Sequence, residues 1–303
     1  MRVLVTGAAG QLGHDLMDVL AGRLPVGADP DFAAGRLPSG VEALGLDRRA
    51  CDLTDEVAVS NCVEAFRPDL IIHAAAYTAV DRAEDEPELA MTVNRDGSAH
   101  VARAAARVGA HLVAVSTDYV FDGTATEPYL EEAPTNPLSV YGATKLAGEL
   151  ACGPSATIAR TSWVVGSHGH NIVKTILQLA DKGTAMTFVD DQHGCPTLSP
   201  DLAVALVALG MQREPGIVHV TNSGATTWFS LARAVLEAAG HDPEMVQPIA
   251  TKDRLPAPKA TRPMFSVLDG QRLVDRGIGP LPAQSAAIRS LVMLLRGQPG
   301  GSA

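Results

Sequence analysis

Tyr141 and Lys145 are a pair of side chains that could do acid–base chemistry together. The stretch that contains them, VYGATKLAG, follows a loop rich in proline and asparagine and leads into a helical pattern. Residues four apart lie on one face of a helix, so a phenol and an ammonium group can point into one pocket. Exposed pairs with this spacing are also common by chance and stabilise a helix only weakly. The pair therefore needs support from the rest of the chain.

A glycine-rich turn near the start of the sequence predicts a second site. A short apolar run ends there, and Gly7, Gly10 and Gly13 lead into a helical pattern. Glycines let such a turn fold tightly and let backbone N–H groups approach a pyrophosphate at the positive end of the helix. The spacing is Gly-x-x-Gly-x-x-Gly, and its place between a strand and a helix favours dinucleotide binding over a bare tight turn. Gln11 and Leu12 belong to the same predicted site.

Charged residues after the second apolar run give conflicting signals about which dinucleotide would bind. Asp47 ends that run, and a carboxylate there accepts hydrogen bonds from the adenosine ribose of NAD. Arg48 follows, and its guanidinium could instead pair with the 2'-phosphate of NADP. Asp52, next to Leu53, could meet the adenine amino group, although a surface helix cap is an equal alternative. Both NADH and NADPH remain open.

The first half of the chain alternates between apolar runs and helical patterns, which predicts a parallel sheet covered on both faces. Strands are expected at 3–6, 41–45, 70–74 and 112–116, and later at 157–158, 186–189 and 217–220. Helices are expected at 12–24, 56–66, 88–108, 146–151, 171–181, 200–210 and 230–239. Small side chains follow the third strand, at Ala74, Ala75 and Ala76. A flat cofactor could pass close to the backbone there, and ordinary tight packing is the alternative.

Composition excludes several classes of protein. The 303 residues allow two domains or one large α/β domain with a smaller one. The longest apolar runs are too short to cross a bilayer, and the first residues do not resemble a secretory signal. Four scattered cysteines without Cys-x-x-Cys spacing argue against a zinc site or a disulfide framework, so a cytoplasmic protein is expected. A net charge of -10 without a basic cluster argues against nucleic acid.

Three irregular segments complete the expected organisation of the chain. Residues 22–40 are dense in glycine, proline and aspartate and are expected to form an inserted surface loop. Strand signals fade after residue 240, where prolines are frequent. The last seven residues, GQPGGSA, are expected to fray.

Motifs taken in chain order resemble those of an extended short-chain dehydrogenase/reductase. These are the glycine turn at residue 7, Asp52-Leu53, HAAAY, Asn94, STDYVF and Tyr141-x-x-x-Lys145. Finer motifs resemble the family of dTDP-4-dehydrorhamnose reductases and their relatives that act on dTDP-4-keto-6-deoxysugars. They are HAAAYTAVDRAEDEP, STDYVFDG, VYGATKLAGE, RTSWV, NIVKTIL, DDQHGCPT and TRPMFSVLD. The likeness extends over nearly the whole chain, so chance no longer explains the tyrosine–lysine pair.

The resemblance implies a division of the chain into two interleaved parts. The first is a Rossmann-type doubly wound α/β domain that binds a dinucleotide, over residues 1–163, with returning segments near 184–189 and 216–239. The second is a smaller α/β substrate-binding domain, mainly over 164–297. A flexible tail is expected at 298–303.

The resemblance also implies a reaction, in which hydride from NADH or NADPH reduces C4 of a dTDP-linked 4-keto-6-deoxyhexose. Tyr141 would donate the proton once a nearby positive charge, supplied by Lys145, lowers the phenol pKa from about 10. Lys145 would also hold the nicotinamide ribose, and Thr117 would hydrogen-bond the substrate oxygen. Asp118 is ambiguous, because a related dehydratase family uses an acid at the matching place for elimination. Tyr119, where that dehydratase would have glutamate, favours simple reduction.

The substrate side of the site is assigned by the same resemblance. The candidates are Thr78, Thr117, Asp118, Tyr141, Trp163, Asn171, Asp191, Gln192, Thr197 and Arg262. Arg262 could pair with the diphosphate in bidentate fashion, or it could be a solvated arginine before a proline. Trp163 could stack on the sugar or base, or it could be a partly buried core residue.

Alternatives remain open for metal binding, for the oligomeric state and for catalytic activity. No metal-binding cluster is expected in the chain, although the resemblance keeps Mg²⁺ open as a ligand. Asp15 stands where the family often has a longer carboxylate associated with magnesium at the subunit interface, which leaves both monomer and homodimer open. A rival to the enzyme is a non-catalytic nucleotide-binding subunit similar to the regulatory subunit of methionine adenosyltransferase. Intact Thr117, Tyr141 and Lys145 favour the enzyme.

Overall fold

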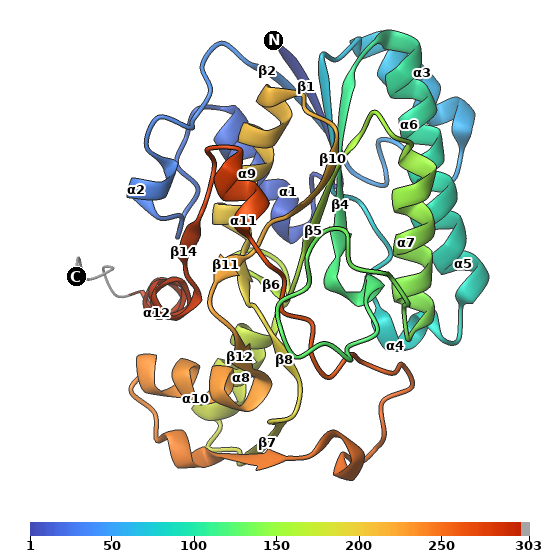
Figure 1. Ribbon diagram of the computed structural model, residues 1–303. Helices are drawn as coiled ribbons and strands as arrows, with labels where there is room; N and C mark the ends of the chain where they lie inside the picture. The colour runs from blue at the N-terminus through green and yellow to red at the C-terminus, as the bar shows by residue number, and fades with distance from the viewer. Residues whose placement is uncertain (298–303) are drawn as a thin grey trace.

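Six parallel strands form a central sheet in the computed structural model, which describes residues 1–297 (Figure 1). Their order is β10-β5-β4-β3-β1-β2, and every neighbouring pair is parallel. The strands are β1 (Arg2–Thr6), β2 (Glu42–Leu46), β3 (Leu70–His73), β4 (His111–Thr117), β5 (Thr157–Thr161) and β10 (Gly216–His219). The strand order changes direction between β1 and β3. Open α/β sheets bind ligands at such a point, outside the carboxyl ends of the strands.

Helices cover both faces of this sheet. α1 (Gln11–Leu20) and α9 (Ser199–Gln212) pack on one face, while α3 (Glu56–Phe66), α6 (Gly97–Val108) and α7 (Val140–Cys152) lie on the other (Figure 1). Because both faces are covered, a central strand such as β3 is buried along its whole length. The predicted Rossmann-type doubly wound fold is confirmed.

A second apolar cluster lies in the later part of the chain, and most of its residues come from five elements. They are α8 (Ile172–Asp181), β7 (Met186–Val189), α10 (Trp228–Ala238), β13 (Val246–Ile249) and α12 (Gln284–Leu295). β7 and β13 pair in parallel and form a two-stranded sheet of their own. This cluster is a separate packing unit beside the central sheet.

Two segments that were predicted to return to the first domain behave differently in the structure. β10 does return, since it pairs with β5 at the edge of the central sheet. Residues 184–189 do not, because β7 pairs with β13, and α10 packs in the second cluster. Met186 and Val189 are buried while Thr187 is exposed, and a strand with one buried face suits a sheet that is covered on one side only.

The helix predicted at 88–108 contains a wider turn. It consists of α5 (Pro87–Met91), a π-helical turn η1 (Thr92–Asp96) and α6. The π turn carries Asn94, whose amide oxygen accepts from the backbone N–H of Tyr77 and whose amide nitrogen donates to the Tyr77 carbonyl and the Thr144 hydroxyl. Asn94 thus ties the segment after β3 to α7, and π turns are often found at functional sites.

The irregular segments contain more structure than their sequences suggest. Within residues 22–40, the short helix α2 (Pro30–Ala33) buries Phe32 and Ala33 in the same cluster as α9, so this segment is only partly a surface loop. β13 and β14 (Leu281–Ala283) form after residue 240, where strand signals are weak. The remaining short elements are α4 (Val80–Ala83), η2 (Asp118–Val120), β6 (Val164–Val165), β8 (His193–Gly194), β9 (Thr197–Leu198), β11 (Asn222–Ser223), β12 (Thr226–Thr227), η3 (Pro243–Met245), η4 (Thr251–Asp253) and α11 (Gln271–Asp275). The tail expected at 298–303 lies outside the described residues.

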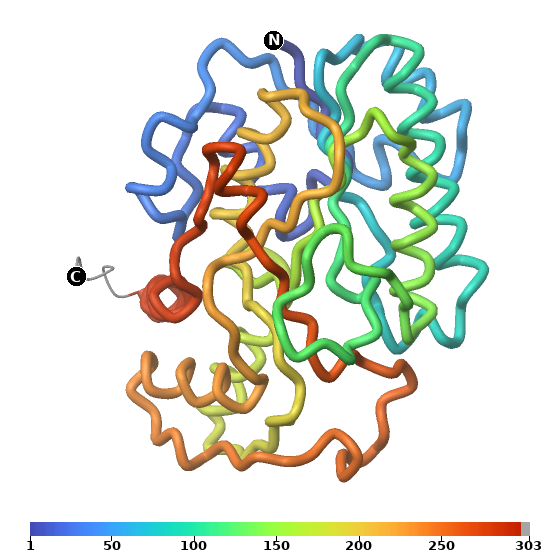
Figure 2. Tube along the Cα trace, in the orientation of Figure 1, coloured from blue at the N-terminus to red at the C-terminus, as the bar shows by residue number. Residues whose placement is uncertain are grey.

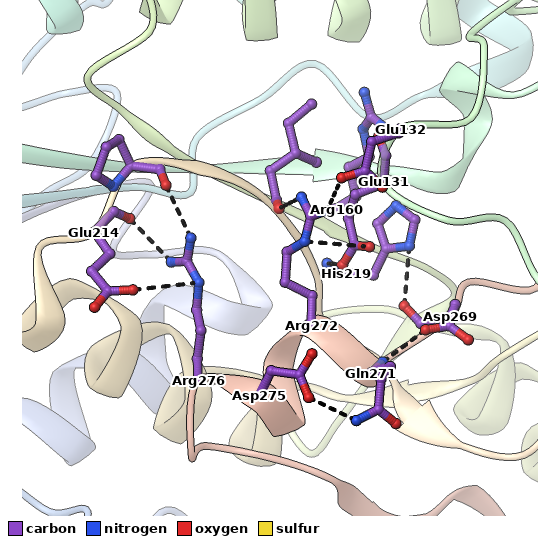
Figure 3. Close-up of polar contacts among 12 residues, drawn as sticks. Glu131, Glu132, Arg160, Glu214, His219, Asp269, Gln271, Arg272, Asp275 and Arg276 are labelled. Carbon is purple, nitrogen blue, oxygen red and sulfur yellow. Dashed lines mark hydrogen bonds and ion pairs between the residues drawn. The ribbon is translucent and has the colours of Figure 1, made fainter.

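Two arginines, one in α11 and one just after it, tie the late part of the chain to the edge of the central sheet (Figure 3). Arg272 donates to the carbonyl of Ile217 in β10 at 3.0 Å and contacts the carboxylates of Glu131 and Glu132. Arg276 donates to two backbone carbonyls just before β10 at 3.1 and 2.9 Å. These contacts fix the end of the segment that Figure 2 shows in orange to red, where it passes from the lower part of the molecule to the sheet edge. Within residues 1–297, no helix is long and apolar enough to span a membrane.

Asp15 is a buried carboxyl group between α1 and α9. Its Oδ2 accepts a hydrogen bond from the Ser199 hydroxyl at 2.5 Å, while Oδ1 has no hydrogen-bond partner among residues 1–297. Burial raises the Asp15 pKa from 3.8 to about 6, and the bond from Ser199 opposes this rise only in part. The folded protein therefore holds the Asp15 proton more tightly than the unfolded chain does. Ionising this group costs stability as the pH rises from about 4 to about 6, and the cost is constant above that.

We expect Asp15→Asn to raise the free energy of unfolding by about 2–3 kcal/mol above pH 6, because two pKa units correspond to roughly that energy. The gain should shrink to nothing near pH 3, where Asp15 is protonated in both states. Urea unfolding at several pH values measures this difference. Asp18→Asn, on the same helix but partly exposed, is the matched control. A gain from Asp15→Asn that is equal at pH 4 and pH 7 would show that burial of the charge is not its cause.

Candidate active site

A cavity of about 850 Å³ opens at the carboxyl ends of β1, β3 and β4, where the strand order changes direction. Its walls come from the glycine turn, the end of β2, the segments after β3 and β4, α7 and the segment after β5. Most of the residues predicted from the sequence line it. They are Gly7, Gly10, Gln11, Leu12, Gly13, Asp47, Arg48, Asp52, Leu53, Ala74, Ala75, Ala76, Thr78, Thr117, Asp118, Tyr141, Lys145 and Trp163.

The glycine turn has the shape that a dinucleotide requires. Gly7 has φ of +75°, and a Cβ there would lie 2.8 Å from the backbone nitrogen of Ala75. A Cβ at Gly13 would lie 2.2 Å from the carbonyl oxygen of Gly7. α1 begins after Gly10 without a side-chain cap, so its first N–H groups are free to meet an anion. The residues present therefore fit a pyrophosphate at the start of α1.

We expect Gly13→Ala to weaken NADPH and NADH binding by roughly tenfold or more, because the added methyl group forces the turn away from the backbone geometry that binds phosphate. Gly270→Ala is the matched control, since a Cβ at that position meets nothing within 4 Å. Fluorescence titration of each reduced cofactor measures the dissociation constants. Wild-type affinity in Gly13→Ala would remove the turn from the cofactor site.

Local turns engage both carboxylates at the adenosine end of the cavity. Asp47 Oδ1 accepts from the backbone N–H groups of the second and third residues after it, at 2.9 and 2.8 Å. Asp52 Oδ1 accepts from the backbone and the hydroxyl of Thr54, and these bonds lower the Asp52 pKa. Asp55, not Asp52, caps α3, so the helix-cap alternative for Asp52 is wrong. Arg48 lines the cavity and has no ion-pair partner within residues 1–297.

The start of α7 brings Tyr141 and Lys145 to the end of β4. Ser139 caps this helix by accepting from the backbone N–H of Gly142 at 3.2 Å. Tyr141 therefore lies in the first helical turn and Lys145 one turn later, on the same face. Thr117 is the last residue of β4, and its hydroxyl lies close enough to the Tyr141 phenol to lower the phenol pKa. The structure thus brings the three predicted catalytic residues together in one cavity.

The prediction that Lys145 lowers the pKa of Tyr141 is wrong. Burial raises the Tyr141 pKa to about 12, and only the hydrogen bond with Thr117 acts in the other direction. Lys145 Nζ instead donates to the carbonyl of Val115 at 2.8 Å. Burial also lowers the Lys145 pKa. Tyr141 is accordingly a neutral phenol at neutral pH, which is the state that can give up a proton.

Asp118 lies beside this group, almost completely buried. The Thr117 hydroxyl donates to its Oδ1 at 3.0 Å, and the Ser266 hydroxyl donates to its Oδ2 at 2.5 Å. Burial raises the Asp118 pKa from 3.8 to about 7, because these hydrogen bonds offset only part of the cost of burying a charge. Ser266 was missed by the sequence analysis. It belongs to the motif TRPMFSVLD, which lies far from Asp118 in the chain.

Two tryptophans also line the cavity. Trp163 and Trp228 stack with ring centroids 3.6 Å apart and an interplanar angle of 10°, and both line the cavity. Trp163 therefore packs against a neighbouring ring, as a core residue would, and it also faces the cavity, as a substrate-stacking residue would. Trp228 was missed, although it is the only other tryptophan in the chain. Gly169 and His170 also line this side without having been predicted.

Four polar residues predicted to bind substrate support the walls instead of lining the cavity. Asn171 caps α8, and its amide donates to Gln11 Oε1 and to a backbone carbonyl, each at 2.8 Å. The carboxylate of Asp191 and the amide of Gln192 both bond Thr251. Thr197 is fully buried, and its backbone N–H donates to the carbonyl of Trp163. Their hydrogen-bonding groups are used within the protein, which the sequence pattern could not show.

Arg262 also lies outside the cavity wall. Its guanidinium forms two hydrogen bonds with the carboxylate of Asp81, at 3.1 and 2.7 Å, and a third with the carbonyl of Ala260. This pairing lowers the Asp81 pKa to about 2. Arg262 is therefore paired with a carboxylate, a partner that neither sequence alternative named.

Magnesium finds no support in the part of the chain that the structure describes. There, no group of three or more histidine, cysteine, aspartate or glutamate side chains could hold a metal ion. Asp15, which the resemblance connects with magnesium, is buried against Ser199.

A known protein family matches nearly the whole chain. The family described as RmlD substrate binding domain matches residues 1–296. The chain belongs to this family. The dTDP-4-dehydrorhamnose reductase of Streptomyces griseus is 42% identical over 99% of this chain and 95% of that protein. The dTDP-4-keto-6-deoxy-D-glucose reductase of Streptomyces niveus is 37% identical over 97% of each.

A solved structure of an RmlD-family relative has the same fold. The dTDP-4-dehydrorhamnose reductase of Bacillus anthracis, in complex with NADP, superimposes with a TM-score of 0.86 at 34% identity. The match covers 97% of this chain and 99% of the other. Membership of the RmlD family therefore agrees with the likeness predicted from the motifs.

Proposed function

We propose that this protein uses NADPH or NADH to reduce the C4 keto group of a dTDP-linked 4-keto-6-deoxyhexose, with dTDP-4-dehydrorhamnose as the leading substrate. The observation that carries this proposal is that Thr117, Tyr141 and Lys145 line the same cavity as the glycine turn. Several RmlD-family relatives are named as reductases of dTDP-4-keto-6-deoxysugars, which supports the substrate class.

The cofactor end of the cavity supports a nicotinamide dinucleotide. Gly7, Gly13 and the uncapped start of α1 fit its pyrophosphate. Bound NADPH or NADH would supply the hydride. Arg48 and Asp47 lie together at the end of β2, so the cavity offers a partner for a 2'-phosphate as well as for a free ribose hydroxyl. We therefore propose that both cofactors are used.

The catalytic residues divide the work of protonating the substrate oxygen. Tyr141, a neutral phenol with a pKa of about 12, donates the proton as negative charge develops on that oxygen. Thr117 offers a hydroxyl beside it and stabilises the same charge. Lys145 is buried one helical turn from Tyr141, where its ammonium group can hold hydroxyl groups of the cofactor ribose.

The tryptophan wall is the proposed place of the sugar and its nucleotide. Trp163 and Trp228 present an aromatic surface to the cavity, and Thr78 adds a hydroxyl on the other side. We propose that the central sheet holds the dinucleotide and that the second apolar cluster, which carries Trp228, supports the substrate.

The proposal is tested by mixing the purified protein with dTDP-4-dehydrorhamnose and, separately, with NADH and NADPH. Loss of reduced-nicotinamide absorbance would establish the reductase and its cofactor preference together. dTDP-4-keto-6-deoxy-D-glucose, the 4-keto sugar named in the Streptomyces niveus relative, serves as the competing substrate. Tight cofactor binding without turnover of either sugar would reject the reductase and favour the non-catalytic nucleotide-binding subunit.

A further inference from the structure

A line of polar groups leads from the phenol of Tyr141 to a buried serine from the far end of the chain. The Thr117 hydroxyl neighbours the Tyr141 phenol and lowers its pKa, and Thr117 Oγ1 lies 3.0 Å from Asp118 Oδ1. Ser266 Oγ lies 2.5 Å from the other carboxyl oxygen of Asp118. Asp118 and Ser266 are each 1% exposed. A buried carboxyl group so close to the proton donor needs a reason, because an isolated buried acid costs stability.

We propose that Asp118 returns a proton to Tyr141 through the hydroxyl of Thr117, and that Ser266 holds the carboxyl group where this transfer requires it. This inference rests on the proposed reduction, since it concerns the proton that Tyr141 gives to the substrate. Asp118 and Ser266 act through Thr117 and Tyr141, so they are positioning and relay residues.

The transfer balances in atoms and charge. As hydride adds to C4, the π pair of the carbonyl moves to the oxygen, which takes the phenolic proton of Tyr141. The Tyr141 phenolate takes the hydroxyl proton of Thr117, and Thr117 Oγ1 takes the carboxyl proton from Asp118 Oδ1. Asp118 ends as a carboxylate that accepts a hydrogen bond from Ser266. Water that enters the cavity after product release restores its proton.

The surroundings of Asp118 suit a group that exchanges a proton near neutral pH. The titratable groups that face it are Tyr119 beside it, Tyr141 from α7 and Cys195 from the segment after β8. Burial raises the pKa of all three, so none is charged near neutral pH. Asp118 has a pKa of about 7, and Tyr141 has one of about 12. The proton therefore moves downhill from Asp118 to a Tyr141 phenolate.

The charge of Asp118 also sets the direction of the Thr117 hydroxyl. An ionised Asp118 can only accept, so Thr117 must donate to it. A protonated Asp118 can donate to Thr117, which leaves the Thr117 proton free for the substrate oxygen or the Tyr141 phenolate. Reduction should therefore be fastest below the Asp118 pKa and decline as the pH rises through it.

Backbone hydrogen bonds on both sides of Ser266 fix its position. Its backbone N–H donates to the carbonyl of His193 at 2.8 Å, and the N–H of Tyr129 donates to the carbonyl of Val267 at 2.9 Å. These bonds join the orange-to-red segment of Figure 2 to β8 and to the loop after η2. A hydroxyl fixed in this way can hold one carboxyl oxygen of Asp118 while the other faces Thr117.

The kinetic test compares Asp118→Asn with the full-length wild type. The variant keeps the shape of the side chain but has no proton to lend. We expect kcat to fall about tenfold or more and the decline near pH 7 to disappear, while the NADPH dissociation constant stays within about twofold. Glu127→Gln, the same change at an exposed carboxylate, should leave the wild-type profile intact. An Asp118→Asn enzyme with wild-type kcat and the same decline would overturn the proposal.

Ser266→Ala gives an independent result if Asp118→Asn folds poorly. Removing a donor to the ionised carboxylate should raise the pKa of Asp118, so the decline in kcat should move to higher pH. A decline that does not move would contradict the role given to Ser266.

An infrared titration separates this inference from the reductase proposal, because it needs no substrate. The carbonyl band of a protonated carboxyl group, taken as wild type minus Asp118→Asn, should fade as the pH rises from about 5 to about 9. A band that is absent throughout would overturn the relay. If the wild type reduces none of the sugars, the proposed reduction fails, and this titration alone decides whether Asp118 holds an exchangeable proton.

Discussion

Tyr141→Phe is expected to lower kcat for reduction of the dTDP-keto sugar by about 10²- to 10⁴-fold, the usual contribution of a positioned general acid. The reason lies in the geometry of the cavity. Tyr141 is a buried phenol with a pKa of about 12, and it lies beside Thr117 at the end of β4. Phenylalanine keeps the ring but removes the one proton that is aimed at the substrate oxygen. Steady-state kinetics with NADPH and NADH measure the loss.

The cofactor should still bind to this variant, since the glycine turn and Lys145 are untouched. Tyr129→Phe is the matched control, because the Tyr129 hydroxyl lies outside the cavity and bonds Asp122 instead. We expect that variant to keep its kcat. Turnover of Tyr141→Phe within about threefold of wild type would remove Tyr141 from the reaction and transfer proton donation to Thr117.

Glu149→Leu is expected to lower the free energy of unfolding by about 3–5 kcal/mol, the usual cost of leaving one member of a buried ion pair without its partner. Arg160 Nε and Nη2 donate to the two carboxylate oxygens of Glu149 at 2.9 and 2.7 Å. Their side chains are only 3% and 6% exposed. The hydroxyl of Ser116 adds a third bond to Glu149. Urea unfolding at neutral pH measures the change.

The position of this pair explains the size of the effect. Arg160 belongs to β5 and is drawn among the residues of Figure 3, and its guanidinium also lies over the ring of Phe121, 5.1 Å from the centroid. Without Glu149 its charge would stay buried without a counter-ion. Replacing both residues, as in Glu149→Leu with Arg160→Met, should recover most of the lost stability, because a well-packed apolar pair can replace a buried ion pair.

An exposed ion pair supplies the control for the Glu149 experiment. Arg103 Nε and Glu56 Oε1 are 2.8 Å apart, but both side chains are about half exposed. Glu56→Ala should therefore leave the unfolding transition unchanged, because water screens the pair. If the free energy of unfolding of Glu149→Leu lies within about 1 kcal/mol of the wild-type value, the buried pair contributes no more stability than an exposed pair would.

Elements whose signals are local could be predicted from the sequence alone. A strand, three glycines and a helical pattern lie within the first residues, so the turn that fits a pyrophosphate could be predicted without any distant contact. Tyr141 and Lys145 are four residues apart, and a helix alone places them on one face. The apolar runs of β1, β3 and β4 predicted a covered parallel sheet for the same reason, since a strand that is buried on both faces is apolar at nearly every residue.

The partners of the polar side chains depend on tertiary packing and could not be predicted from local patterns. Ser266 meets Asp118 across 148 residues of sequence, and Arg262 meets Asp81 across 181. No local pattern encodes such a meeting, because it depends on how the late segment crosses the sheet edge. Burial sets the pKa of Asp118 and Tyr141 in the same way, through neighbours from separate elements. The residue types that can do the chemistry are therefore written in the sequence, while their charge states and hydrogen-bond partners follow from the packing.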